Sequence, residues 1–176
     1  MRTAVIGGPE REFRYELRRI WADDLPLLVA VMLNPSRADA ESDDPTIRRL
    51  MALARNWGKG GLLVVNLYAY RASTPRVLAG AEDPVGPRNA AFLDAAMLYA
   101  GGHGRRALAA WGAPPPSLAE ADHAARSRQV TAMAKARGVD LYCLGTTQAG
   151  HPMHPMARGR HRIPRDVVPN IWKAAA

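Results

Sequence analysis

A short motif near the start of the chain places polar side chains where a bound water could be activated. Asn34-Pro35-Ser36 follows an apolar run, and this turn would hold the Asn34 amide where it can orient a water. Pro35 and Ser36 would then contact the bound molecule. The acidic loop that follows supplies Asp43 and Asp44, and either carboxylate could polarise the water. The same residues also fit a plain turn, a solvated acidic loop and a helix cap.

A polar residue inside an apolar strand is a candidate for recognition of a nucleobase. Asn66 lies inside the otherwise apolar run 62–67, and a buried amide must find hydrogen-bond partners. An Asn side chain presents a donor beside an acceptor, as reading a base edge requires, but a structural bond to loop backbone fits equally well. Tyr68, Tyr70 and Trp111 could stack on a base, although aromatic residues beside strands also occur in cores.

The segment after residue 145 is rich in His, Pro and Arg. His151 and His154 lie on a rigid loop and could stabilise a developing negative charge or contact phosphate. Incidental histidines on a surface loop are the alternative. No Cys partner and no H-E-x-x-H spacing supports a metal site, so we expect none.

Arginines near this segment are candidates for nucleic-acid contacts. Arg158, Arg160 and Arg162 cluster in the basic region 145–176, and Arg71 lies in an earlier loop. Guanidinium groups beside a site suit phosphate contacts. The alternative is that these arginines belong to a solvated basic tail without a binding role.

Composition sets the broad class of the protein. The 176 residues suit one domain, 48% are hydrophobic, and the formal charge of +8 attracts polyanions, although excess surface Arg can also be compositional background. Cys143 is the only cysteine, which excludes an internal disulfide. The chain shows neither an apolar signal core nor a run long enough to cross a bilayer, so we expect a cytoplasmic monomer without membrane contact.

Alternating strands and helices must position these side chains. Apolar runs predict four buried strands at 25–33, 62–67, 106–111 and 139–144, and a polar–apolar alternation predicts an N-terminal edge strand at 12–17. Helices are predicted at 44–57, 89–99 and 117–137. This order predicts an α/β fold, a three-layer α/β/α sandwich with a small, mostly parallel four-stranded sheet. The motifs would then meet at the carboxyl ends of the strands.

Taken in order, the motifs resemble those of a known bacterial family. They are Met32-Leu33-Asn34-Pro35-Ser36, Asp43-Asp44-Pro45-Thr46-Ile47-Arg48-Arg49, Val65-Asn66-Leu67-Tyr68-Ala69-Tyr70-Arg71, Asp83-Pro84-Val85-Gly86-Pro87, Ala110-Trp111-Gly112 and His154-Pro155. The combination is similar to the domain of unknown function numbered 1643 over nearly the whole chain. That family brings no activity with it.

A more distant resemblance is to the uracil-DNA glycosylase superfamily, which carries four similar motifs in the same order. It implies that Asn34 positions the hydrolytic water, that Asn66 reads an extruded base and that His154 stabilises the departing base. It also implies no metal or organic cofactor, and a single Cys excludes the four-cysteine iron–sulfur cluster of some branches. The chain departs from the superfamily pattern at Met32, where glycine is usual, and lacks the wedge leucine after His154-Pro155, where Met153 or Met156 could substitute.

We therefore expect a DNA glycosylase-like N-glycosidic hydrolase that flips a damaged or modified base out of DNA and excises it, as in DNA repair. Two alternatives stay open at this point. One is a non-catalytic module that binds nucleic acid or a modified base, and the other is a hydrolase that acts on free nucleosides or nucleotides.

Overall fold

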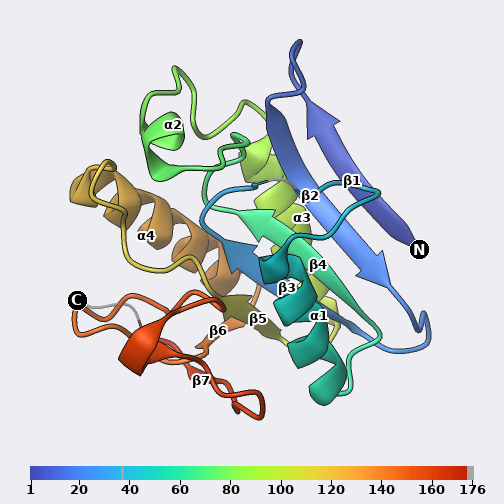
Figure 1. The fold of residues 1–176 in the computed structure, drawn as a ribbon. Helices are drawn as coiled ribbons and strands as arrows, with labels where there is room; N and C mark the ends of the chain where they lie inside the picture. Colours follow the sequence, from blue (N-terminus) through green and yellow to red (C-terminus); the bar gives the residue numbers. More distant parts are fainter. Residues whose placement is uncertain (37, 174–176) are drawn as a thin grey trace.

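A single mixed sheet runs through the computed structural model, which describes residues 1–36 and 38–173 (Figure 1). Its strands are β1 (Arg2–Gly7), β2 (Phe13–Ile20), β3 (Leu27–Met32), β4 (Gly61–Asn66), β5 (Arg106–Ala109), β6 (Asp140–Cys143) and β7 (Asn170–Ile171). They lie in the order β1-β2-β4-β3-β5-β6-β7. The helices are α1 (Pro45–Asn56), α2 (Pro75–Ala79), α3 (Asn89–Gly102) and α4 (Glu120–Ala136), with a 3₁₀ turn η1 (Gly159–His161).

The expected α/β class is confirmed, but the sheet is larger than predicted. Strands β4, β3, β5 and β6 pair in parallel and correspond to the four predicted strands. Three antiparallel strands extend this central part: β1 and β2 on one side and β7 on the other. The sheet therefore has seven strands rather than four. The predicted edge strand is β2, and it is not an edge, because β1 pairs with its outer side.

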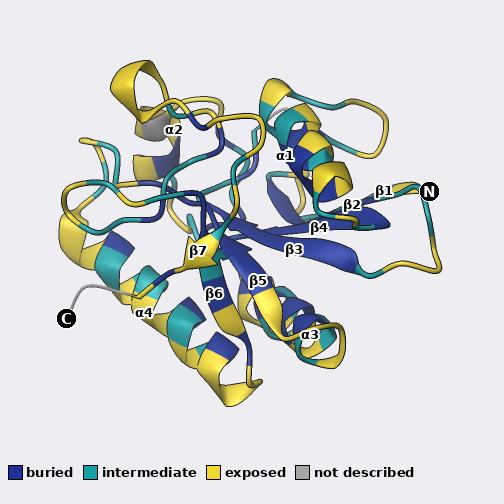
Figure 2. Ribbon diagram, turned by 90° about the horizontal axis from the view of Figure 1, so that it is seen from below, coloured by how far each residue is buried: buried dark blue, intermediate teal, exposed yellow. Residues whose placement is uncertain are grey.

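Helices cover both faces of the sheet, which makes three layers. Val29 and Val31 of β3 pack in a core with residues of α3 and α4, whereas Leu28 and Ala30 pack against α1 on the other face. Strand residues alternate between faces, so each central strand contributes to both cores. Figure 2 shows the dark, buried central strands between α1 on one side and α3 and α4 on the other.

Helix α1 starts where the sequence pattern predicts. The Asp44 side chain accepts a hydrogen bond from the backbone N–H of Ile47 at 2.9 Å, and Pro45 occupies the first turn. Its apolar face includes Leu50 and Leu53, both fully buried. The first turn of α1 lies beside the carboxyl ends of β3 and β4, close to Asn34 and Asn66.

The C-terminal segment is not a free basic tail. Ile163 is buried in the core beneath α1, and Trp172 is buried in the core on the other face. The Nε1 of Trp57 donates to the carbonyl of Val167 at 3.0 Å, which ties this segment to the end of α1. Within the described ranges, no helix combines the length and apolar character needed to cross a membrane.

Candidate functional site

A cavity of about 180 Å³ lies at the carboxyl ends of β3 and β4. Met32 and Asn66, the last residues of those strands, form part of its wall. Asn34, Ser36, Asp44 and His154 line the same cavity, although they come from three separate segments of the chain; the remaining lining residues are Arg14, Leu33, Thr46, Ile47, Val64, Ala72, Ser73 and Thr74. The structure thus brings several of the predicted site residues to one place.

The Asn66 side chain is fully buried and faces this cavity without a partner. Neither its Oδ1 nor its Nδ2 makes a hydrogen bond to any described residue. A buried amide that leaves both groups unsatisfied costs about 1–3 kcal/mol per group. Unpaired polar atoms in a native structure call for an explanation, and a bound molecule with a complementary donor and acceptor supplies one.

Asn34 is held in one orientation by its own neighbourhood. Its Nδ2 donates to the carbonyl oxygens of Pro35 and Ala72, each at 2.9 Å. Both amide hydrogens are therefore engaged, and the side-chain oxygen is left to accept a hydrogen bond from a molecule in the cavity. Pro35 does not line the cavity itself, but its carbonyl fixes the Asn34 amide and also accepts from the Ala72 N–H at 2.9 Å.

His154 presents a hydrogen-bond donor at the same place. Its Nδ1 accepts from the backbone N–H of Met156 at 3.1 Å, so the proton of the neutral ring lies on Nε2. Burial lowers the pKa of His154 below its ordinary value of 6.5, although the nearby Asp44 carboxylate acts to raise it. The ring is therefore neutral near pH 7. Gly112 donates its N–H to the Pro152 carbonyl at 2.9 Å and so helps to hold the loop that carries His154.

Asp43 and Asp44 are adjacent in sequence, but the structure gives them different surroundings. One oxygen of Asp44 caps α1, and the described residues offer the other no hydrogen bond, so it remains available beside the cavity. Asp43 lies outside the cavity, and its two oxygens pair with Arg19 at 2.8 Å and Arg2 at 3.0 Å. Unlike Asp44, Asp43 is therefore not brought together with Asn34 and His154 at the cavity.

Arg14 is a cavity residue that the sequence interpretation missed. Its side chain is 2% exposed, its NH1 group donates to the Ala38 carbonyl at 2.6 Å, and its Nε has no partner among the described residues. The polar–apolar alternation predicted that polar residues of this strand face solvent. Most of β2 is instead buried on both sides, because α1 and α3 cover its two faces.

The three predicted stacking aromatics do not line the cavity. Tyr68 and Trp111 are buried in the core against α3 and α4, and Trp111 meets Trp172 edge-on at 5.1 Å between ring centroids. Tyr70 packs edge-on against Phe13 at 6.0 Å. Desolvation raises the pKa of Tyr68 to about 12. These residues support the fold around the site rather than a bound ring, as is usual for aromatics beside strands.

His151 also lies apart from His154. It lines a separate hollow with Glu120, and its Nε2 is 3.4 Å from a Glu120 carboxylate oxygen. Its ring meets the buried His123 edge-on at 5.3 Å. Among the described residues, no group of three or more His, Cys, Asp or Glu side chains could hold a metal ion.

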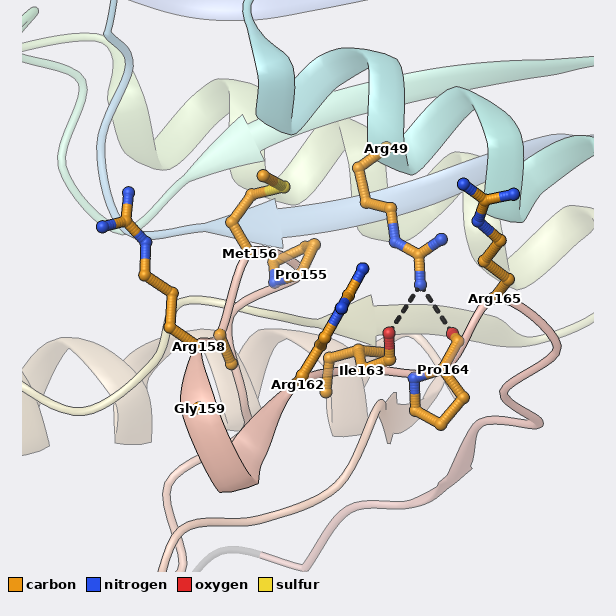
Figure 3. A pocket seen from close by; sticks show the side chains of 10 residues that line it. Arg49, Pro155, Met156, Arg158, Gly159, Arg162, Ile163, Pro164 and Arg165 are labelled. Carbon is orange, nitrogen blue, oxygen red and sulfur yellow. Dashed lines mark hydrogen bonds between the residues drawn. The ribbon is translucent and has the colours of Figure 1, made fainter.

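Two of the predicted nucleic-acid-binding arginines line a second, larger pocket. This basic pocket has a volume of about 840 Å³ and lies between α1 and the C-terminal segment (Figure 3). Arg49, Arg158, Arg162 and Arg165 surround it, and none of the described acidic residues lines it. Arg49 is anchored through hydrogen bonds from NH2 to the Ile163 carbonyl at 3.0 Å and the Pro164 carbonyl at 2.6 Å, drawn in Figure 3.

The other two predicted arginines lie outside both pockets. Arg160 is exposed and donates from Nε to His161 at 3.2 Å, whereas Arg71 donates to the Arg11 carbonyl at 3.3 Å. Consecutive residues of one segment line the two pockets: His154 lines the cavity at the ends of β3 and β4, and Pro155 and Met156 line the basic pocket.

Comparison with known proteins identifies a family but no activity. Residues 14–156 match the family described as "Protein of unknown function (DUF1643)". No curated protein and no solved structure matches the chain significantly. The matched region begins at Arg14 and extends to Met156, and it therefore includes every residue that lines the cavity.

Proposed function

The chain belongs to the DUF1643 family of proteins of unknown function, and we propose that it hydrolyses the N-glycosidic bond of a base extruded from DNA. The observation that carries this proposal is the fully buried, unpartnered Asn66 amide in the wall of a small cavity. A nucleobase edge offers the donor and acceptor that such an amide lacks. The resemblance of the motif order to that of the uracil-DNA glycosylase superfamily, in which Asn66 is itself one of the motifs, also supports the proposal.

The size of the cavity favours a single ring system. Its volume of about 180 Å³ is below the roughly 300–1,000 Å³ of typical ligand pockets. A whole nucleotide would extend out of it, which suits a base that enters while its sugar and phosphate stay outside. Met32 lines the cavity without filling it, so the missing glycine does not close the site.

The lining residues match the charge changes of glycosidic hydrolysis. The bond between C1′ and the base nitrogen breaks, its electron pair leaves with the base, and water bonds to C1′. The free oxygen of Asn34 would orient that water, and the uncapped oxygen of Asp44 would accept its proton. His154 Nε2–H would stabilise the negative charge on the departing base, and the Asp44 carboxylate would also stabilise the cationic sugar.

In this proposal the basic pocket would hold the DNA backbone. A base enters an active site only after it leaves the duplex stack, and the strand must be held while it is extruded. Arg158 and Arg162 lie on the same segment as His154 and would contact phosphates that flank the extruded nucleotide. Single strands and duplexes are both compatible with this arrangement.

The proposal is tested by a base-release screen. Oligonucleotides carrying one uracil, hypoxanthine, xanthine or hypermodified pyrimidine are incubated with the protein, and abasic sites are detected by strand cleavage in alkali. We expect release of at least one base, reduced about 100-fold or more by Asn34→Ala. Asn56→Ala is the matched control, because the Asn56 amide also donates to a backbone carbonyl, that of Arg165 at 3.1 Å. Asn56 is the last residue of α1, whereas the first turn of α1 lines the cavity.

The rival functions give different results in the same screen. Binding of an oligonucleotide without release, unaffected by Asn34→Ala, indicates a non-catalytic binding module. Turnover of nucleosides or nucleotides without activity on oligonucleotides indicates a hydrolase of free monomers. Either result contradicts DNA base excision.

A further inference from the structure

A bulge in the sheet directs Arg14 into the cavity. Between β1 and β2, Val5 pairs with Glu16 and Ile6 with Arg14, so Tyr15 is an extra residue on β2. An extra residue reverses the alternation of side chains between the two faces of a strand. After the bulge, Leu17 packs against α1. Before the bulge, Arg14 lines the cavity on the face that α1 covers. Tyr15 lies on the opposite face and stacks on Phe92 of α3.

The charge of Arg14 has no direct counter-ion. Within the described part of the chain, no carboxylate lies within ion-pairing distance of its guanidinium, and its one hydrogen bond is to the Ala38 carbonyl at 2.6 Å. Burial lowers the pKa of Arg14 to about 10, against the raising effect of Asp44, so the group stays charged at neutral pH. A buried, unpaired cation is costly unless something else neutralises it.

The start of α1 adds to the positive potential at this place. Thr46 and Ile47, in its first turn, line the same cavity as Arg14. A helix N-terminus carries about half a positive charge, which offsets part of the charge of the Asp44 cap. His154 contributes no charge near neutral pH. Arg14 and the helix end therefore outweigh Asp44, and the cavity attracts a negative group.

We propose that the cavity selects a planar heterocycle that carries a negative charge, bound through its ionised group by Arg14 and through its hydrogen-bonding edge by Asn66. Candidates of this class are carboxylated pyrimidines and ionised oxopurines. The inference rests on the proposed function only for the idea that this heterocycle is a nucleobase. Recognition itself is measured on free bases, without any excision.

The test compares two bases of almost identical shape. Isothermal titration calorimetry measures binding of 1-methyluracil-5-carboxylate and of the neutral 1-methyluracil-5-carboxamide to the full chain at pH 7.5. Hydrogen bonds to charged groups are roughly twice as strong as neutral ones, so we expect the carboxylate to bind about tenfold tighter. Arg14→Gln should abolish this preference and Arg14→Lys should retain part of it. Arg76→Gln, which removes an exposed charge close to the lining residue Thr74, should leave the preference unchanged.

Equal binding of the two bases, tighter binding of the carboxamide, or no binding of either overturns the inference. The wild-type comparison needs no variant, so the result does not depend on whether Arg14→Gln folds. Failure here is separable from failure of the proposed function. Excision of neutral uracil without a charge preference would contradict this inference alone, whereas a carboxylate preference without base release from DNA would contradict base excision alone.

Discussion

Asn89 donates its side-chain amide to the main chain of Asn66, through hydrogen bonds to the carbonyls of Asn66 at 3.1 Å and Leu67 at 2.9 Å. Both asparagines are fully buried. The Nδ2 of Asn89 thus fixes the end of β4, whereas neither polar atom of the Asn66 side chain has a partner in the described structure. Two buried asparagines in contact have opposite roles, one supporting the strand end and the other facing the cavity.

The first prediction contrasts these two residues. Asn89→Leu should lower the free energy of unfolding by about 1–3 kcal/mol, because it removes the side-chain donor to the buried Asn66 carbonyl. The Leu67 carbonyl keeps its hydrogen bonds from Arg126. Asn66→Leu should leave stability unchanged or raise it, because it removes unsatisfied groups, and it should abolish base release. Urea denaturation measures the stability of the two variants, and the base-release assay measures their activity. A loss of stability in Asn66→Leu as large as in Asn89→Leu would show that Asn66 is structural.

A substitution at Asp44 separates its two roles. Asn caps helices about as well as Asp, so Asp44→Asn should change the free energy of unfolding by less than about 0.5 kcal/mol. It removes the carboxylate that would accept a proton, and single-turnover base release should fall by about 10²–10⁴-fold. Unchanged release rates in a stably folded Asp44→Asn would exclude Asp44 as the proton acceptor.

Stability should fall as the solution becomes more acidic than pH 6.5. Burial lowers the pKa of both His123 and His154 below 6.5 in the folded protein. Below pH 6.5 the unfolded chain therefore binds protons that the folded chain does not, and the free energy of unfolding decreases until the folded-state pKa values are reached. Above pH 6.5 both rings are neutral in both states, and their contribution is fully present.

Urea denaturation between pH 7.5 and pH 5 measures this dependence. The variant His123→Gln/His154→Gln should show a shallower decrease over that range than the wild type. His103→Gln serves as the control, because His103 is exposed at the end of α3. If the free energy of unfolding fell equally steeply with pH in the double variant and the wild type, His123 and His154 would not be the source of the pH dependence.

Arginines of the basic pocket should control the salt dependence of DNA binding. Each phosphate contact contributes about 0.7–0.9 to the slope of log affinity against log salt concentration. Arg158→Ala/Arg162→Ala should therefore reduce that slope by roughly 1.4–1.8 and weaken binding to all sequences equally. Fluorescence anisotropy over a salt series measures it. Truncation after Met156 would not be a clean test, because it removes Ile163 and Trp172 from the cores.

Arg128→Ala/Lys135→Ala is the matched control for the arginine pair. Both residues are exposed on α4, on the opposite face of the sheet from α1. This variant removes the same net charge but should leave the salt slope unchanged. Equal losses in the two double variants would indicate that overall charge, rather than the basic pocket, attracts DNA.

Local patterns were sufficient for the central strands, the main helices and the meeting of Asn34, Asn66 and His154. Apolar runs predict strands that are buried on both faces, and capping residues and prolines predict where helices start. Parallel strands bring their carboxyl ends to one edge of the sheet. The Asp44 cap is of this kind, since it depends on residues three positions apart. The strands, helices and caps lie within the reach of a single segment and its periodicity, and the meeting of the three side chains follows from the rule for parallel sheets.

Contacts between segments far apart in the chain were decided by the tertiary structure alone. The bulge at Tyr15 turns Arg14 into the cavity, Arg2 and Arg19 engage Asp43 but not Asp44, and the C-terminal segment folds back over α1. No local pattern records which polar atoms are left without partners, because satisfaction of a hydrogen bond depends on every segment that packs around it. For that reason the sequence determined the scaffold and the candidate residues, whereas the packed structure determined which of them face the cavity unpaired.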